Sequence, residues 1–271
     1  MGFALGPAAR AAGYRLRGYD TIGSTNAEAV EAAGAGDPGG IWFAALQQTA
    51  GRGRRGRQWE SPAGNLAATL LIVPEADPTS AATLGFAAGV ALRAILPEDR
   101  VRIGIDGADA ADGTSRIALK WPNDLLADGA KLAGILLEAV KVADGRHAVA
   151  IGFGINVVAA PQGLPYPATS LAELGVKGSA EDVFEALSDA WVDTFGLWDE
   201  GRGVGPVLER WRASAAGIGA PVAVNQNGEV LRGIFETIDD AGRLIVRTDD
   251  DRRIAITAGD VHFGATASAR S

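Results

Sequence analysis

The segment Arg116–Val140, RIALKWPNDLLADGAKLAGILLEAV, decides the fold that this sequence predicts. Its short apolar runs are typical of β-strands, and the pair Asp128-Gly129 between two of them is typical of a tight hairpin turn. A further run, HAVAIGFGINVV at 147–158, follows a second such pair at Asp144-Gly145. Together these runs predict a hairpin-rich, largely antiparallel central sheet.

Strands and helices are expected on both sides of this centre. Upstream, YRLRGYDTIGSTNAEAVEAAGAG reads as a strand, a turn and a helix, with Thr25 and Glu28 at capping-box spacing. Further strands are expected at Ile41–Gln48 and 65–73, and helices at Ser80–Leu96 (stopped by Pro97), 180–197 and 206–216. The Gly-, Ala- and Asp-rich stretch 103–116 is expected to be a surface excursion, and no function follows from it.

The residue pattern changes beyond Gly217, where short runs typical of β-strands alternate with residue pairs typical of turns. A segment of about 50 residues with this pattern fits a small β-barrel. We therefore expect two domains, residues 1–217 and 218–271.

Composition excludes several classes of protein. With 271 residues, 47% apolar and 21% charged, the chain can bury a globular core. It has no cysteine, which excludes thiolate chemistry. Its only histidines are His147 and His262, which disfavours a Ser-His-Asp triad. The net charge of −8 disfavours nucleic-acid binding as the main activity. Without a signal peptide or a long apolar run, we expect a cytoplasmic protein with no membrane partner.

The loop GRGRRGRQWESP, Gly51–Pro62, matches the G-x-G-x-x-G pattern of dinucleotide sites. A helix must follow such a pattern, and Pro62 and Gly64 disfavour one here. No Gly-Lys-Ser/Thr follows, which excludes a Walker A loop. Alternating glycines and arginines instead favour a loop that clamps phosphate, while a solvated surface loop is the simpler alternative.

Five motifs in order carry a family resemblance: STN at 24–26, QTAGRGRRGRQWESP from Gln48, KWPNDLL from Lys120, KLAGILLE from Lys131 and GFGIN from Gly152. With them the chain resembles the bacterial biotin protein ligases, or biotin–[acetyl-CoA-carboxylase] ligases. The resemblance implies an α+β fold related to class II aminoacyl-tRNA synthetases: a mixed, largely antiparallel central sheet with flanking helices, plus a C-terminal SH3-like β-barrel. The helix-turn-helix domain of the family's repressors is missing, so no operator binding is expected.

The resemblance also implies a reaction. ATP and biotin would form biotinyl-5′-adenylate and pyrophosphate, and a lysine of the biotin carboxyl carrier protein would attack the mixed anhydride. Mg²⁺ would be bound mainly through the substrate phosphates. No enzyme nucleophile is needed, because the protein aligns reactants and neutralises charge. A homodimer is left open, and the alternatives are a lipoate or octanoate ligase and a nucleic-acid-binding regulator.

The same resemblance distributes the site residues. It assigns biotin to Ser24, Thr25, Asn26, Gln48, Arg52, Gly53, Arg54 and Lys131. It assigns ATP and the adenylate to Gly51, Arg52, Arg54, Arg57, Trp59, Lys120, Asn123 and Asn156. The catalytic residues would be Lys131, Arg54 and Asp124.

Local structural roles compete with three of these assignments. Thr25 could be only a helix cap, Asn156 only a turn residue, and Lys131 only an exposed hairpin residue. Whether Asp124 organises the acceptor lysine or assists magnesium is left open.

Overall fold

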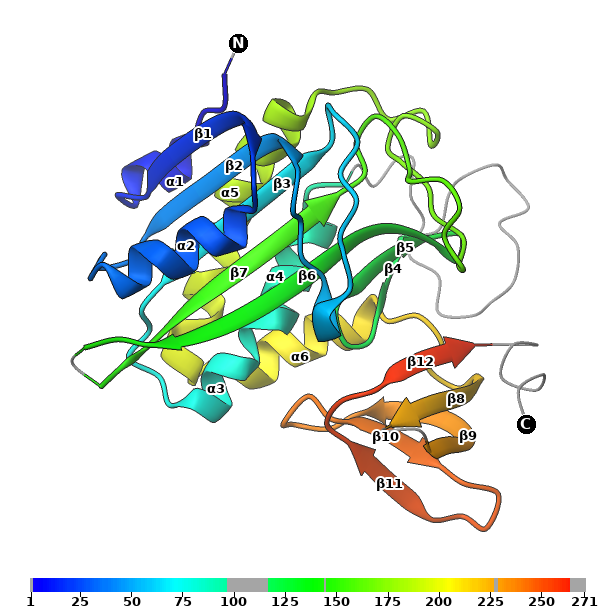
Figure 1. The fold of residues 1–271 in the computed structure, drawn as a ribbon. Helices are drawn as coiled ribbons and strands as arrows, with labels where there is room; N and C mark the ends of the chain where they lie inside the picture. The colour runs from blue at the N-terminus through cyan, green and yellow to red at the C-terminus, as the bar shows by residue number, and fades with distance from the viewer. Residues whose placement is uncertain (1, 97–116, 144, 227–228, 264–271) are drawn as a thin grey trace.

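A computed structural model describes residues 2–96, 117–143, 145–226 and 229–263. The stretch 103–116 and Pro97 lie outside the described residues. In the described part of the chain a seven-stranded sheet has the order β1-β2-β3-β7-β6-β5-β4, and a five-stranded sheet follows (Figure 1). In the large sheet β1 and β2 pair in parallel and the remaining neighbours pair antiparallel, which confirms the predicted largely antiparallel centre.

The strands of the large sheet are β1 (Arg15–Ile22), β2 (Ile41–Gln48), β3 (Leu66–Ile72), β4 (Ile117–Lys120), β5 (Asp124–Ala127), β6 (Ala130–Lys141) and β7 (His147–Ile155). The helices around it are α1 (Pro7–Ala11), α2 (Thr25–Gly34), α3 (Pro78–Ala82), α4 (Leu84–Ala94), α5 (Ala180–Trp198) and α6 (Val204–Ala213), with short 3₁₀ turns η1 (Arg54–Gly56) and η3 (Asp199–Gly201). The small sheet contains β8 (Pro221–Gln226), β9 (Glu229–Ile238), β10 (Leu244–Arg247), β11 (Arg253–Ile256) and β12 (Asp260–Phe263).

Both faces of the large sheet are covered, which explains why its central strands are apolar throughout. In β2, Trp42 belongs to the main core with α4 and α5, whereas Phe43 belongs to a smaller core beneath α2. The same alternation separates Leu70 from Leu71 in β3. Successive side chains of a strand point to opposite faces, so strict alternation of apolar and polar residues is lost when both are buried. Figure 1 shows α2 on the near face and α4, α5 and α6 on the far face.

The expected hairpin turn between β5 and β6 is present. Asp128 and Gly129 both have positive φ, 47° and 77°, as a two-residue turn of the primed type requires. This turn sets Lys131 opposite Leu126 near the start of β6. The turn and a β-bulge between Leu125 and Leu126 set the register that brings the two motifs KWPND and KLAGILLE together.

Two details of the predicted helices were wrong. The N-cap of α2 is Ser24, whose extended backbone lets its hydroxyl accept the Ala27 N–H, and Thr25 is already helical. The expected helix Ser80–Leu96 is broken at Thr83 into α3 and α4. The Thr83 hydroxyl donates to the Ser80 carbonyl and accepts from Trp198 Nε1 at 2.8 Å, a buried contact from α5 that no local pattern contains.

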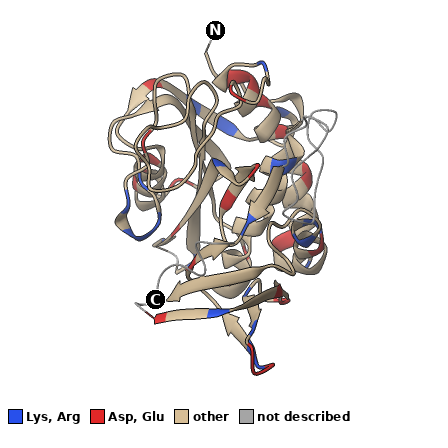
Figure 2. Ribbon diagram, turned by 90° about the vertical axis from the view of Figure 1, so that its right-hand side faces the viewer, with Lys and Arg blue, Asp and Glu red and all other residues tan. Residues whose placement is uncertain are grey.

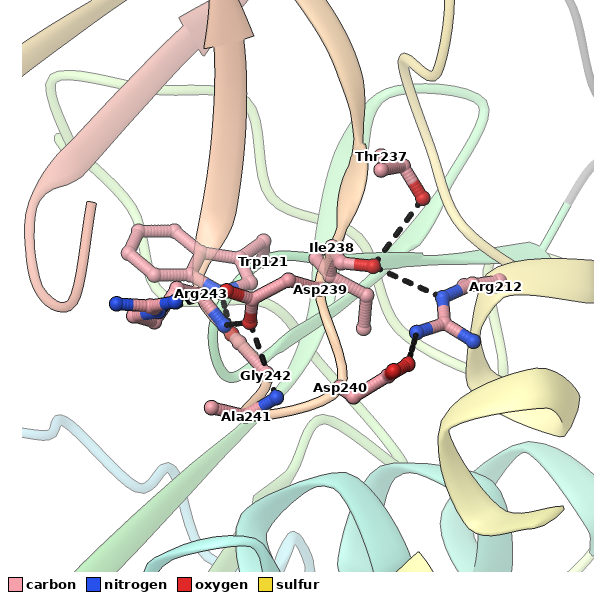
Figure 3. A network of polar contacts seen from close by, with 9 residues as sticks. All are labelled: Trp121, Arg212, Thr237, Ile238, Asp239, Asp240, Ala241, Gly242 and Arg243. Atoms are coloured by element: carbon pink, nitrogen blue, oxygen red, sulfur yellow. Dashed lines mark hydrogen bonds and ion pairs between the residues drawn. The ribbon is translucent and has the colours of Figure 1, made fainter. Parts of the chain in front are cut away.

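The small antiparallel sheet is docked on the part of the chain that forms the large sheet and its helices (Figure 3). Trp121 Nε1 donates to the Gly242 carbonyl at 2.9 Å. Arg212, in the last turn of α6, donates to the Ile238 carbonyl at 2.9 Å and pairs with Asp240 at 3.1 Å. These contacts hold the turn after β9 against α6 and against the turn that follows β4.

The end of α6 at Ala213 and the start of β8 at Pro221 bracket the predicted domain boundary. Gly217 between them has a positive φ of 80°, and its Cα faces the Phe263 ring so closely that a Cβ would lie 2.2 Å from it. We propose that the catalytic domain spans residues 1–217 and the small domain residues 218–271. In the part of the chain that the structure describes, no helix is long and apolar enough to cross a membrane.

Candidate functional site

The candidate site lies on the α2 face of the large sheet, where three strand positions are glycine. Gly134 and Gly154 are paired across β6 and β7, and Gly152 is the next residue on the same face of β7. A Cβ at Gly152 would lie 2.1 Å from Asn26 Oδ1, and one at Gly154 would lie 2.4 Å from the Trp59 ring. Only glycine therefore lets these side chains rest directly on the sheet.

A row of neutral polar side chains closes one end of this glycine floor. Gln48 Oε1 accepts from the Thr25 amide at 2.8 Å and lies 3.2 Å from its hydroxyl. Thr69 Oγ1 lies 2.8 Å from Thr25 Oγ1 and donates to Asn26 Oδ1 at 2.7 Å. Ser24 precedes them as the cap of α2. Ser24, Thr25, Asn26 and Thr69 are all buried, so the row is held by the fold itself.

Glu138 connects this polar row to the arginine loop, which we define as Gly51–Arg57. Glu138 Oε2 accepts from Asn26 Nδ2 at 2.8 Å, and Glu138 Oε1 lies 3.8 Å from Arg52 Nη1. Because Asn26 donates to Glu138, its amide oxygen is turned toward Thr69 and the floor. One carboxylate thus orients an amide on one side and attracts a guanidinium on the other.

The arginine loop folds back on itself instead of opening a helix. Gly53 N–H donates to the Arg57 carbonyl at 2.7 Å, and Trp59 N–H donates to the Gly51 carbonyl at 3.0 Å. Arg55 at the tip has a left-handed φ of 56°. The loop borders an open cavity of about 600 Å³ whose floor includes Leu136 and Glu138. This geometry agrees with the sequence argument against a dinucleotide-binding helix.

The arginines of the loop point to different partners, and they form the blue stretch at the left of Figure 2. Arg54 Nη1 donates to Asn123 Oδ1 at 2.9 Å, and its partial burial lowers its pKa. Arg55 and Arg57 both pair with Asp260 of β12, at 3.1 and 2.7 Å. Arg52 therefore lies beside Glu138, and Arg54 lies beside Asn123, whereas Arg57, assigned to the adenylate from the motif, is engaged with the small domain.

Lys131 lies at the junction of the loop and the KWPND segment. Its Nζ is 2.7 Å from Asp124 Oδ1, and both side chains are largely buried. The ammonium also lies 5.5 Å from the Trp59 ring centre and 5.7 Å from that of Tyr166. Such distances permit cation–π attraction, so two rings and a carboxylate fix the position of one charge. The alternative of an exposed hairpin lysine is excluded.

The KWPND segment forms the turn between β4 and β5, with a cis bond at Trp121-Pro122. Asn123 accepts from Arg54 and donates through Nδ2 to the Ile135 carbonyl at 2.8 Å. Lys120 lies 5.7 Å from the Phe263 ring centre, and burial lowers its pKa. Of the two lysines, Lys131 faces the glycine floor and Lys120 faces the small domain.

Asn156, directly after β7, is buried behind Lys131. Its Nδ2 donates to the Thr169 carbonyl at 3.0 Å, and its Oδ1 accepts no hydrogen bond from the described part of the chain. The segment that carries Thr169 also pairs with the backbone of Lys131 and brings Tyr166 over its ammonium. Asn156 thus joins the end of β7 to the segment that carries Thr169.

Sequence reasoning missed four residues of this arrangement: Thr69, Glu138, Tyr166 and Asp260. Thr69 and Glu138 had a faint signal, because Thr69 is the polar residue of β3, Glu138 is the acidic residue of β6, and alternation places each on the glycine face. Tyr166 and Asp260 had no such signal in the sequence. His147 begins β7 at the end of that strand opposite Asn156. Among the described residues, no three His, Asp or Glu side chains cluster so as to hold a metal ion.

Comparisons with known proteins identify the family of the chain. The Biotin/lipoate A/B protein ligase family matches residues 32–156, and the Biotin protein ligase C terminal domain matches residues 217–264. The Biotin–[acetyl-CoA-carboxylase] ligase of Paracoccus denitrificans is 40% identical over 253 residues, covering 89% of this chain and 97% of that protein. The ligase of the same name from Mycobacterium tuberculosis is 36% identical, covering 92% and 90%.

Solved structures give the same answer for the fold. The biotin protein ligase from Aquifex aeolicus in complex with biotin and ATP superposes with a TM-score of 0.71 at 21% identity, covering 92% of this chain and 98% of that one. The biotin protein ligase from Leishmania major in complex with biotinyl-5-AMP has a TM-score of 0.57 at 27% identity, covering 90% and 98%. The predicted fold class is therefore confirmed, and the chain belongs to the biotin/lipoate protein ligase family, on its biotin protein ligase branch.

Proposed function

We propose that this chain is an ATP-dependent biotin–[acetyl-CoA-carboxylase] ligase. It activates biotin as biotinyl-5′-AMP and transfers the biotin to a lysine of the biotin carboxyl carrier protein of acetyl-CoA carboxylase and related carboxylases. The similarity to ligases of that name over nearly their full length supports this function.

The observation that carries the proposal is the bridge through Glu138. A row of neutral donors and acceptors and a group of cations lie on one glycine floor, and this one carboxylate contacts both. Biotin has the matching polarity, since its ureido ring is neutral and its valerate end is an anion. A ligand that spans the floor thus meets groups complementary to each of its ends.

On the neutral side, Ser24, Thr25, Asn26 and Gln48 would bind the ureido ring. Thr69 and Glu138 would hold Thr25 and Asn26 in orientation instead of contacting biotin. Because the row is buried and already hydrogen-bonded, it would lose little conformational freedom on binding. Such a site selects for a ring that both donates and accepts hydrogen bonds.

On the charged side, Arg52, Gly53, Arg54 and Lys131 would lie over the biotin carboxylate. Gly51, Arg57, Trp59, Lys120, Asn123 and Asn156 would complete the adenylate site. The biotin carboxylate attacks the α-phosphorus of ATP, so negative charge builds up where carboxylate and phosphate meet. Lys131 and Arg54 would neutralise that charge as catalytic residues, an electrostatic contribution that commonly reaches about 10²–10³ in rate for one donor.

Asp124 would hold the Lys131 ammonium until the anionic substrates take it over. In the second step the same carboxylate would be free to orient the acceptor lysine. Mg²⁺ would enter with ATP and be bound chiefly by its phosphates, with Asp124 as the protein carboxylate nearest the reacting groups. Both attacking groups, the biotin carboxylate and the acceptor lysine, belong to the substrates. The proposed reaction therefore requires no histidine or cysteine of the enzyme.

The test is ATP–pyrophosphate exchange, run separately with biotin, lipoate and octanoate. We expect exchange with biotin alone, followed by incorporation of biotin into a purified biotin carboxyl carrier domain. Exchange driven by lipoate or octanoate but not biotin would replace this assignment with the related lipoate or octanoate ligase.

A further inference from the structure

The arginine loop belongs to the catalytic domain, yet two of its four arginines are held by the small domain. Asp260, the first residue of β12, accepts from Arg55 at 3.1 Å and from Arg57 at 2.7 Å. Both arginines lie more than 200 residues earlier in the chain. A single carboxylate therefore connects the loop to a separate sheet.

Neighbouring arginines of the loop are held from opposite sides. Arg54 bonds to Asn123 of the catalytic domain, and the next residue bonds to Asp260. Arg55 adopts a left-handed backbone, which is unfavourable for a residue with a side chain and persists only when its surroundings enforce it. Backbone hydrogen bonds from Gly53 to Arg57 and from Arg57 to Arg54 close this turn, and the two ion pairs with Asp260 hold its tip against the small domain.

The small domain is itself anchored, so Asp260 is presented from a fixed position. At the far end of the interface the hydrogen bonds of Trp121 and Arg212 hold the turn after β9 (Figure 3). At the near end the Lys120 ammonium lies over the Phe263 ring. Lys120 and Trp121 belong to the same KWPND turn whose Asn123 holds Arg54. That turn therefore contacts the small domain and the arginine loop at once.

Charge favours the same role for Asp260. Burial alone would raise its pKa, but the hydrogen bond from Arg57 and the charges of Arg57, Arg55 and Arg54 outweigh burial and lower it. The carboxylate is thus ionised at neutral pH. It balances only one of the two positive charges that it holds, so the loop tip keeps a net positive charge for phosphate.

We propose that Asp260 is a positioning residue of the ligase: through Arg55 and Arg57 it holds the arginine loop over the adenylate and thereby sets how long the intermediate is retained. This inference rests on the proposed function. It assigns the small domain a defined part in the first half-reaction, through one carboxylate that does not contact the substrates.

The experiment compares Asp260→Asn with wild type in the full chain. Biotinyl-5′-AMP is first formed on the enzyme from labelled biotin and ATP. Excess unlabelled biotin and ATP are then added, and the release of labelled adenylate is followed over time. Two half-exposed ion pairs are lost, so we expect release to accelerate about three- to tenfold. Asp260→Glu keeps the charge and should return release to within about twofold of wild type.

Asp240→Asn is the matched control. Asp240 also pairs across the domain interface, with Arg212, but it lies far from the loop, and Arg212 keeps its bond to the Ile238 carbonyl. We expect this variant to release adenylate at the wild-type rate. The proposal is overturned if Asp260→Asn retains adenylate as wild type does, or if Asp240→Asn releases it equally fast.

A readout without substrates separates this proposal from the proposed function. Trypsin cleaves after arginine, and a loosened loop exposes Arg52, Arg54, Arg55 and Arg57 to it. Peptide mapping should show these bonds cut faster in Asp260→Asn than in wild type or Asp260→Glu, and equal rates would overturn the positioning role. A wild-type enzyme that forms no adenylate would instead overturn the proposed function, and the cleavage rates would still decide the role of Asp260.

Discussion

The two sides of the glycine floor are built in different ways. The polar row of Thr25, Asn26 and Thr69 is buried, and its side chains hydrogen-bond to one another and to Gln48. The arginine loop is largely exposed, and its long side chains are fixed by partners in other parts of the chain.

The difference follows from the ligand chemistry proposed for each side. A neutral ring is recognised by hydrogen bonds whose geometry must be set before binding, because a buried donor or acceptor without a partner costs about 1–3 kcal/mol. A phosphate is recognised by charge-assisted hydrogen bonds, which long arginine side chains on an exposed loop can supply. The buried row and the exposed loop thus meet at Glu138. Each prediction below tests one side of this comparison.

The largest effect is expected at the charged end. Lys131→Ala removes the cation nearest the reacting groups and leaves Asp124 without its partner, so the rate of adenylate formation should fall about 10²- to 10³-fold. Single-turnover formation of biotinyl-5′-AMP measures this. Lys141→Ala, at the far end of β6, is the control and should retain the wild-type rate. A decrease below tenfold would contradict the role assigned to Lys131.

A smaller effect is expected when a methyl group is added to the glycine floor beside the buried polar row. In Gly152→Ala the new methyl group would fall on Asn26 Oδ1, and the buried row cannot yield without breaking hydrogen bonds. Overpacking of this kind costs about 1–3 kcal/mol, so we expect biotin to bind roughly 10- to 100-fold more weakly.

Calorimetric titration with biotin in the absence of ATP measures the effect of Gly152→Ala. Gly196→Ala, in α5, is a matched control, because a Cβ there meets no atom within 4 Å. Unchanged biotin affinity in Gly152→Ala would show that this row does not contact the ligand.

The bridge between the two sides should respond more moderately. Glu138→Gln keeps the shape of the side chain but removes its charge, and the new amide can present its N–H₂ to Asn26. The Asn26 amide would then lose its fixed orientation, and we expect a decrease in biotin affinity of about fivefold, equivalent to roughly 1 kcal/mol.

The matched control for Glu138→Gln is Glu209→Gln on the exposed face of α6, which should bind biotin normally. If Glu138→Gln changes adenylate retention and leaves biotin affinity unaltered, then Glu138 belongs functionally to the loop alone.

The smallest effect is expected from pH. The pKa of Asp260 in the folded protein lies below its unfolded value, so the ion pairs contribute fully above the unfolded value and are lost only as pH falls through the lower folded value. Adenylate release should therefore change by less than about twofold between pH 8 and pH 5, where a carboxylate with an ordinary pKa near 4 is still ionised. A steep rise in release between pH 7 and pH 5 would show that the loop depends on a different titrating group.

Much of the architecture could be predicted because local patterns decide it. The Asp128-Gly129 turn, the apolar runs around it and the helix after Ser24 depend on neighbours within a few residues, and all three are present. The order of five short motifs was sufficient to indicate the family. The Asp128-Gly129 turn also indicated that the strands on its two sides form one hairpin, although the bulge between Leu125 and Leu126 was not predicted.

What only the tertiary structure decided are contacts between residues far apart in the chain. Thr83, at the break between α3 and α4, accepts from Trp198, 115 residues away, and Glu138 meets Asn26 across 112 residues. Asp260 meets Arg57 across 203 residues, on a sheet whose docking no local pattern encodes. Propensity and spacing describe a residue and its near neighbours, whereas the orientation of an amide or an arginine is set by whichever side chain packing brings beside it. The sequence thus determined which chemistry was present and on which strands, and folding determined which partner holds each group in place.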